Sequence, residues 1–156
     1  MGNFKPLTSV VDGITRKLSE TFGDGYTIYP EVVKQGRVNP CFFIRLQGAN
    51  KTLFRDGTYH LENSFCIHYF SKSTNQAYAE CQEILEELHF ALELIEVNGN
   101  PVRGIKMRGD FHDETLMFYV DYNLFVREVS PQEKMEELKP INITTGSSTD
   151  NATNGP

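Results

Sequence analysis

The segment from Ser64 to Ile95 constrains the fold most, because it passes from a strand pattern directly into a helix pattern. Residues 64–69 alternate between polar or small side chains and large apolar ones, which is the two-residue period of a half-buried strand. Ser73 and Gln76 then have the spacing of a capping box, with which a helix begins. The segment therefore predicts a strand that leads into a helix after a short connection.

The predicted helix has an apolar side and an acidic side. Its apolar residues recur at steps of three and four, as burial of one helix face requires, and they are Ala77, Cys81, Ile84, Leu85, Leu88, Leu92 and Ile95. The opposite side carries Glu80, Glu83, Glu86, Glu87 and Glu93. No Lys or Arg occurs between Thr74 and Val97. A strand and a helix joined in this way pack most simply face to face, so other strands must extend the sheet.

The rest of the chain supplies a second helix and those strands. Pro6 suits the first turn of a helix, and apolar residues from Leu7 to Phe22 trace one helical face. Strand patterns occupy residues 26–29, 41–47, 94–97, 102–111 and 115–126. We expect an α/β (α+β) fold in which a mainly antiparallel sheet packs against the N-terminal helix and a long central helix.

Two segments place apolar side chains where the expected core does not need them. Residues 48–59 are polar and irregular and predict an extended hairpin or flap, with exposed candidates for contact at Lys51, Phe54, Arg55 and Tyr59. The second face of the 115–126 strand carries Met117, Tyr119 and Phe125. Phe90 adds a lone aromatic ring to the acidic side of the central helix. These residues predict a surface that another chain covers, and the alternative for the strand face is a small satellite core under a loop.

The end of the chain differs from the rest. Ser130 to Glu133 reads as the start of a short helix, whose apolar residues are Met135 and Leu138. We expect one domain over residues 1–130, a short docking helix with an extension over 131–143, and a flexible polar tail over 144–156. The tail lacks the apolar residues that would offset the entropy of ordering it.

Composition excludes several classes of protein. A chain of 156 residues is long enough for one self-sufficient core. Its net charge of −6 argues against a protein that grips nucleic-acid phosphates. No apolar run is long enough to span a bilayer, so we expect no membrane contact. Its three cysteines are widely spaced and predict buried free thiols.

No pattern of catalytic or cofactor-binding residues occurs. The four histidines form no closely spaced ligand pair, and no cysteine pair has zinc spacing. Residues 112–114 form an acidic turn that favours a solvated hairpin tip over a cation site. We therefore predict no catalytic, cofactor or metal site and no enzymatic activity, although an enzyme using His112 and Asp113 stays the weakest alternative.

The strand patterns resemble a known family. The residues that carry the resemblance are Asn39–Ile44, Phe65–Phe70, Val102–Gly104 with Met107-Arg108, and Leu116–Tyr122. Together with the N-terminal helix, they look like the tail terminator family of bacteriophages of Gram-positive hosts. The resemblance covers roughly Leu7 to Val126 and contains no catalytic signature.

The resemblance implies a structural virion protein that caps the tail tube as a ring, usually a homo-hexamer. Such a ring stops tube polymerisation and forms the interface for head–tail joining, so its partners are further copies of itself, the tail tube protein and a head-tail connector or stopper protein. It would assemble in the host cytoplasm and reside in the virion tail or neck, with DNA only passing through its lumen. An acidic lumen repels phosphates, and its candidate residues are Glu80, Glu83, Glu87, Asp113 and Glu114. The alternatives are another neck or tail component (adaptor, stopper or tube subunit) and a non-viral protein-binding module.

Overall fold

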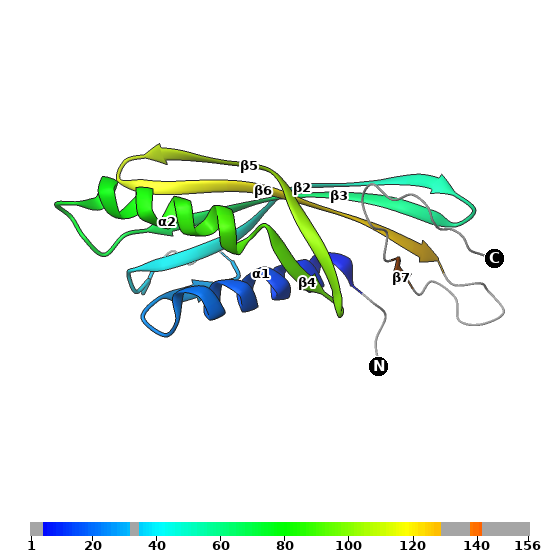
Figure 1. Ribbon diagram of the computed structural model, residues 1–156, viewed down its shortest axis with the longest axis horizontal. Coiled ribbons are helices and arrows are strands. Elements are labelled where there is room, and N and C mark those ends of the chain that lie inside the picture. The colour runs from blue at the N-terminus through cyan, green and yellow to red at the C-terminus, as the bar shows by residue number, and fades with distance from the viewer. Residues whose placement is uncertain (1–4, 32–34, 129–137, 142–156) are drawn as a thin grey trace.

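A computed structural model of the chain describes residues 5–31, 35–128 and 138–141. Two helices and seven strands follow one another along the described chain (Figure 1). They are α1 Pro6–Phe22, β1 Thr27–Tyr29, β2 Cys41–Arg55, β3 Thr58–Phe70, α2 Ala77–Ala91, β4 Leu94–Val97, β5 Asn100–His112, β6 Thr115–Glu128 and β7 Leu138–Ile141.

The strands form one sheet in the order β1-β2-β3-β6-β5-β4, with β7 paired to β6 beyond this path. β1 runs parallel to β2, and the other five pairings are antiparallel. The expected mixed fold with a mainly antiparallel sheet and two helices is confirmed, with the β1–β2 pairing as the exception. Because β1 and β2 pair in parallel, a tight hairpin turn cannot join them.

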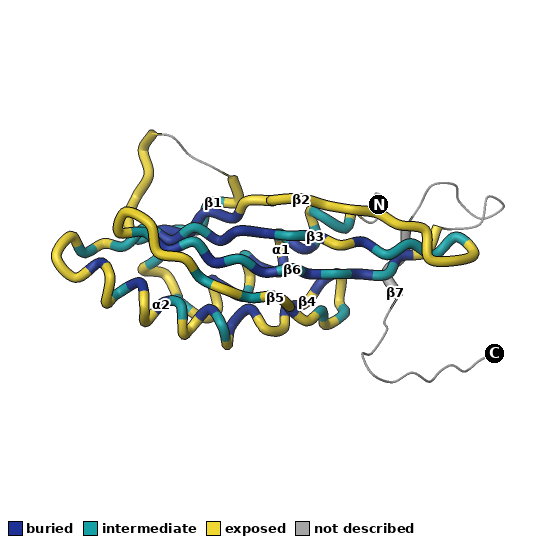
Figure 2. The backbone as a smooth tube through the Cα atoms, turned by 90° about the horizontal axis from the view of Figure 1, so that it is seen from above, coloured by how far each residue is buried: buried dark blue, intermediate teal, exposed yellow. Residues whose placement is uncertain are grey.

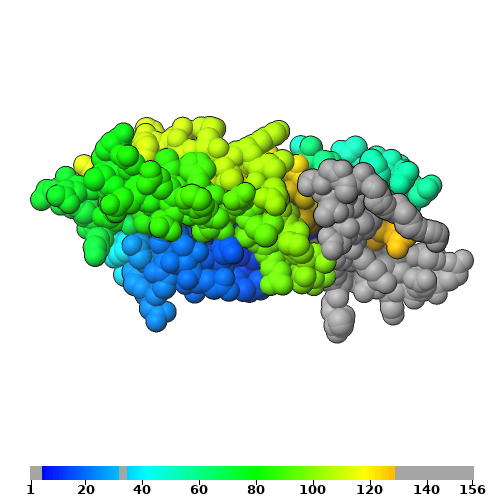
Figure 3. All heavy atoms as spheres, in the orientation of Figure 1, coloured from blue at the N-terminus to red at the C-terminus, as the bar shows by residue number. Residues whose placement is uncertain are grey.

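Both helices lie on the same side of the sheet and bury its inner face (Figures 1 and 3). The alternating residues of the strands point into this core, where Phe42, Phe65, Tyr69, Phe118 and Tyr122 are fully buried. The helices contribute Val10, Ile14, Leu18, Cys81 and Leu88, and Leu92 follows at the end of α2. The two-residue strand period and the helical stripe therefore meet in one hydrophobic core.

The chain approaches itself closely where α2 ends. The Tyr122 hydroxyl donates a hydrogen bond to the Leu92 carbonyl at 2.6 Å. Gly104 lies opposite Tyr122 in β5, and a Cβ atom there would come within 2.5 Å of the same carbonyl oxygen. The absence of a side chain at Gly104 thus lets β5 pass directly beneath the end of the helix.

The central helix is shorter than its sequence pattern predicts. The expected long helix reaches only Ala91, and at 15 residues it is shorter than the 17-residue α1. Ile95 fits the helical spacing but belongs to β4, because β4 forms a hairpin with β5 through the Asn98-Gly99 turn. Ser73 Oγ does accept a hydrogen bond from the Gln76 amide at 2.9 Å, which is one half of the predicted capping box.

The predicted terminal helix is wrong where the structure describes it. Leu138 and Pro140 lie in β7, which pairs antiparallel with the last four residues of β6. Where β6 extends past its pairing with β5, its backbone N–H and C=O groups are free to pair with another strand. The sequence pattern around Met135 does not reveal this pairing. Met135 itself and the tail over 144–156 lie outside the described residues.

Two parts of the sheet extend away from the helical layer. The face opposite the helices, which we term the outer face, has no described helix over β2, β3 and β6 (Figure 2). The β2–β3 hairpin also projects beyond the helices (Figure 1), and we term its residues 48–62 the arm. In β2, the first four residues are buried and the remaining eleven are exposed. The expected hairpin between the two strands is confirmed, although it is a continuation of both strands rather than an irregular flap.

Candidate interaction surfaces

The tip of the arm carries an aromatic cluster on its outer side. Phe54 contacts Phe125 of β6, with ring centroids 5.0 Å apart, and His60 contacts the same ring at 4.7 Å. Phe54 is 53% exposed, and the Arg55 guanidinium lies 5.4 Å from its ring. Arg127 lies exposed at the same end of the arm, opposite Thr58. This cluster brings together two predicted contact residues that lie 71 positions apart in sequence.

The other side of the arm carries the remaining flap candidates. The Lys51 ammonium lies 4.3 Å above the ring of Tyr59, a cation–π contact within the hairpin. Leu53 is 60% exposed beside them, although the sequence reading missed it. Its place in the predicted hairpin was the available signal. Successive side chains of a strand point to opposite faces, and a hairpin that projects beyond the helices exposes both faces.

Among the described residues, the chain itself covers one end of the outer face of the sheet. Phe43 is 4% exposed because Tyr29 packs edge-on against it at 5.3 Å and Phe70 lies at the same distance. Arg37 in turn lies 4.1 Å above the ring of Phe70. This end is therefore a small satellite core, but it lies at Phe43 and Phe70 and not at Met117, Tyr119 and Phe125, for which the sequence left that alternative open.

The rest of the outer face keeps its aromatic surface half-exposed. Met117 and Tyr119 are of intermediate exposure, and the Tyr119 hydroxyl donates to the Met117 sulfur at 3.5 Å. Arg108 of β5 stacks 4.3 Å above the Tyr119 ring while it pairs with Asp110. Phe125 lies on the same face but toward the arm, so the three predicted residues of this strand face divide between two places.

On this face, the pKa values of His68 and Cys66 are shifted from the ordinary values of these side chains. Burial lowers the pKa of His68 from 6.5, and the charges of Arg45, Arg37 and His112 act in the same direction. Burial likewise raises the pKa of the Cys66 thiol. Both groups are thus held neutral. The three cysteines are buried free thiols, as the sequence predicts.

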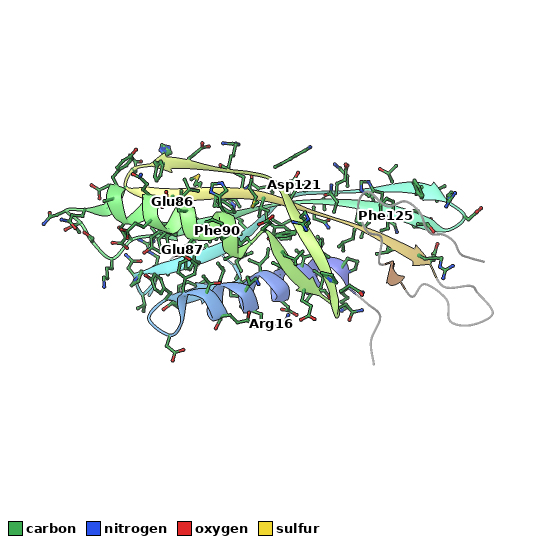
Figure 4. The ribbon with its side chains drawn as sticks, viewed as in Figure 1. Arg16, Glu86, Glu87, Phe90, Asp121 and Phe125 are labelled. Atoms are coloured by element: carbon green, nitrogen blue, oxygen red, sulfur yellow. The ribbon has the colours of Figure 1, made fainter. Side chains whose placement is uncertain are left out.

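The acidic side of α2 contains an exposed stripe. Glu83, Glu86, Glu87 and Phe90 are all exposed, and Phe90 is 80% exposed (Figure 4). Glu80 differs, because its carboxylate accepts hydrogen bonds from the Tyr69 hydroxyl and from the Lys72 amide at 3.1 Å. That carboxylate and burial raise the pKa of Tyr69 well above its ordinary value, with burial the larger cause. Glu80 therefore fastens α2 to β3 and is set apart from the other predicted acidic residues.

The two remaining acidic candidates directly follow the last residue of β5. Asp113 and Glu114 form the turn to β6, and both have positive φ values of 51° and 64°. Both are exposed, as the expected solvated hairpin tip requires. Among the described residues, no group of three or more His, Cys, Asp or Glu side chains has the geometry to hold a metal ion.

One further exposed aromatic pair escaped the sequence reading. Tyr78 of α2 and Phe111 of β5 contact each other with ring centroids 5.0 Å apart and are 65% and 38% exposed. Tyr78 lies beside the apolar stripe of the helix, but nothing in its spacing reveals a partner 33 residues away.

Comparisons with known proteins identify the family. A family model described as phage tail terminator protein matches residues 9–134. A search of the curated proteins finds no match. A solved structure with 10% sequence identity aligns over 77% of this chain and 96% of its own length, but its TM-score of 0.31 is too low to carry an argument.

The match over residues 9–134 includes α1 from Ser9 onward, the whole of α2 and all strands from β1 to β6. No helix among the described residues is long and apolar enough to cross a membrane. The resemblance that rested on four strand segments is thereby confirmed at the level of the family. The chain belongs to the phage tail terminator proteins, which are structural components of the virion tail.

Proposed function

We propose that this protein caps the end of the phage tail tube as a hexameric ring of identical copies. In that position it stops further addition of tube protein and presents the surface to which a head-tail connector or stopper protein binds. Assembly takes place in the host cytoplasm, and the ring stays in the neck of the virion. The observation that carries the proposal is the arm, because it extends the sheet to a place where the helices no longer cover it.

The physical argument rests on what the arm exposes. Leu53 and Phe54 leave more than half of their surfaces in solvent at the tip of a projecting hairpin. Large apolar surface of this kind marks a contact with another protein. The half-exposed Met117 and Tyr119 provide a second surface on the outer face, at a different place. A ring protomer needs two such unlike patches, because heterologous contacts that close by rotation join different surfaces of neighbouring copies.

Charge supports the passage of DNA. Each chain has a net charge of −6, so a closed ring is strongly acidic. Acidic side chains at the lumen repel phosphates and let the duplex pass without binding. The Asp113–Glu114 turn is exposed at the end of the β5–β6 hairpin, and we assign it to the lumen or its rim. A ring with a basic lumen would contradict this assignment.

The test is electron microscopy of tails assembled without this protein. Loss of a terminator should give tails that are longer than normal or not joined to heads. Loss of a tube subunit should instead give no tube, and loss of a stopper or adaptor should leave tails of normal length. Tails of normal length that join heads in the absence of this protein would contradict the proposed function.

A further inference from the structure

One long edge of the sheet has no strand beside it. β1 pairs with β2 at residues 41–43, and β2 continues from Ile44 to Arg55 with β3 on its inner side. Among the described residues, no strand pairs with the outer side of this stretch. The backbone N–H and C=O groups along such an edge can pair with a strand of another chain.

The side chains of this edge would favour such pairing if the strand were flat. Leu46, Leu53 and Phe54 are 43%, 60% and 53% exposed. A long, flat edge strand with exposed apolar side chains is a site at which chains join edge to edge. The β2 edge departs from this description in two ways, which are its geometry and the sign of its charges.

The geometry of β2 is irregular at two places. Its pairing with β3 shifts register between Leu46 and Gly48 and again between Leu53 and Arg55, so β2 carries one extra residue at each shift. A bulge of this kind bends the strand and increases its twist, which prevents a regular strand from pairing along the whole edge. The interior pairing of β3 with β6, by contrast, runs through all of β3 without a shift.

The charges of β2 have one sign. The strand carries Arg45, Lys51 and Arg55 and no Asp or Glu. If two copies paired these edges antiparallel over their exposed length, Arg45 of each copy would lie opposite Arg55 of the other, and like charges opposite each other are destabilising. Glu62 offsets this little, because it lies on β3, about 4.8 Å further from an added strand. Asp56 follows β2 in the turn.

The second long edge, on β5, has the same features. β4 pairs with β5 at residues 100–103, which leaves the edge open from Ile105 to His112. The pairing of β5 with β6 shifts register between Ile105 and Arg108, and Lys106 there has a positive φ of 56°. The described register shifts of the sheet all lie in pairings of β2 or β5, whereas β1, β4 and β7 are edge strands of three or four residues.

We propose that the bulges and the three cations of β2 guard its free edge against strand pairing with a second copy. Each chain has two long free edges, on β2 and β5, so unguarded pairing at both would produce an open-ended polymer. The guard directs contacts between copies to the faces of the arm rather than to its backbone. This inference does not require the proposed ring, because a free chain has the same edges before it assembles.

The experiment compares three variants of the full-length chain that all lack Gln47, the extra residue of the first bulge. The threonine variant carries Arg45→Thr, Lys51→Thr and Arg55→Thr, which remove the cations and favour a strand. The glutamate variant replaces the same three residues by Glu and so keeps like charges on the edge. The third variant carries Lys5→Gln, Arg16→Gln and Lys72→Gln, which remove three exposed cations away from the β2 edge and match the net charge of the threonine variant.

The threonine variant should form particles whose mass in light scattering grows with time and which bind thioflavin T. The glutamate variant and the third variant should show neither effect. All the substituted side chains and Gln47 are exposed, so circular dichroism should show the same fold in each variant. Restoration of Gln47 in the threonine variant should slow the growth, and equal growth with and without Gln47 would contradict the role of the bulge.

The remaining outcomes separate the guard from the proposed function. A threonine variant that keeps the mass of the wild type and binds no dye would overturn the guard. Growth of the glutamate variant or of the third variant would also overturn it, because the loss of Gln47 or of net charge would then be the cause. A wild-type chain that stays at the mass of one copy would contradict the ring but not the guard, provided that the threonine variant alone grows.

Discussion

The part of the sheet beneath the helices and the part that forms the arm are built from the same strands but end in opposite environments. In the first, Phe118, Val120 and Tyr122 of β6 are fully buried between the sheet and the helices. In the second, β2 continues for eleven residues with every side chain exposed. The β2 strand of the arm adds little to the stability of an isolated chain, because burial of apolar surface supplies most of the stabilisation of a fold. Within the arm, Leu61 of β3 is the residue that the core buries. The helix-covered half therefore supplies most of the stability of the fold, which leaves the arm for the contacts with other chains that we propose.

The largest effect on stability should come from the centre of the covered half. Phe118→Ala removes a fully buried ring that packs edge-on against His89 at 5.3 Å. The loss should be about 3–5 kcal/mol of unfolding free energy. Urea denaturation measures it, with Phe90→Ala on the exposed stripe as the matched control. A similar loss in both variants would remove the distinction between the covered and exposed surfaces.

The next largest effect should come from the close approach of β5 to the end of α2. In Gly104→Ala, the new methyl group would lie 2.5 Å from the Leu92 carbonyl oxygen and 2.8 Å from Val120. Because a backbone atom cannot move aside as a flexible side chain does, we expect a loss of about 1–3 kcal/mol. Gly48→Ala, with open space around its Cβ position, is the control in thermal or urea unfolding. Equal stability of the two variants would show that β5 and α2 do not meet as described.

A smaller effect should appear as a pH dependence at the outer face. The folded state lowers the pKa of His68 below its ordinary value of 6.5, chiefly through burial. The unfolded chain therefore binds the proton more readily, and the stability from neutral His68 is fully present above about pH 6.5. It is lost as the pH falls through the lowered folded value. His68→Gln should give a flatter dependence of unfolding free energy on pH in this acidic range, and parallel curves for the two proteins would contradict the assignment.

The smallest effect on stability should occur at the arm, where the effect on assembly is large. Phe54→Asp alters a side chain that is 53% exposed, so the unfolding free energy should change by less than about 0.5 kcal/mol. The same substitution places a charge inside the proposed contact and should weaken ring formation in light scattering. Thr8→Asp, which places the same charge at an exposed position of α1 outside the arm, serves as the control. Normal assembly and normal tail lengths with Phe54→Asp would argue against a role for the arm.

Sequence patterns predicted the covered half well, because burial of one face imposes a period on the side chains. The alternation from Leu116 to Val126 and the stripe from Ala77 to Leu92 both point to the core. The same reasoning identified Phe90 as exposed and the 48–59 segment as a hairpin. These features depend on local spacing, which a single sequence contains.

Features that depend on distant backbone partners could not be predicted in this way. Ile95 fits both the helical spacing and the strand pattern of residues 94–97, and only its pairing with Val102 decides for β4. Leu138 of β7 pairs with Glu128 of β6, although the sequence around Leu138 suggested a helix. The bond between Tyr69 and Glu80, which removes Glu80 from the free acidic residues, also requires the folded arrangement of β3 and α2.

The most direct test of the account is a cryo-electron microscopy reconstruction of the head-proximal end of the assembled tail. We expect a ring of copies of this chain in which residues 48–62 and the Tyr119 region of the outer face are both covered by other chains. A reconstruction in which this arm projects into solvent, or in which the chain occurs as a single copy away from the tube end, would contradict the central claim.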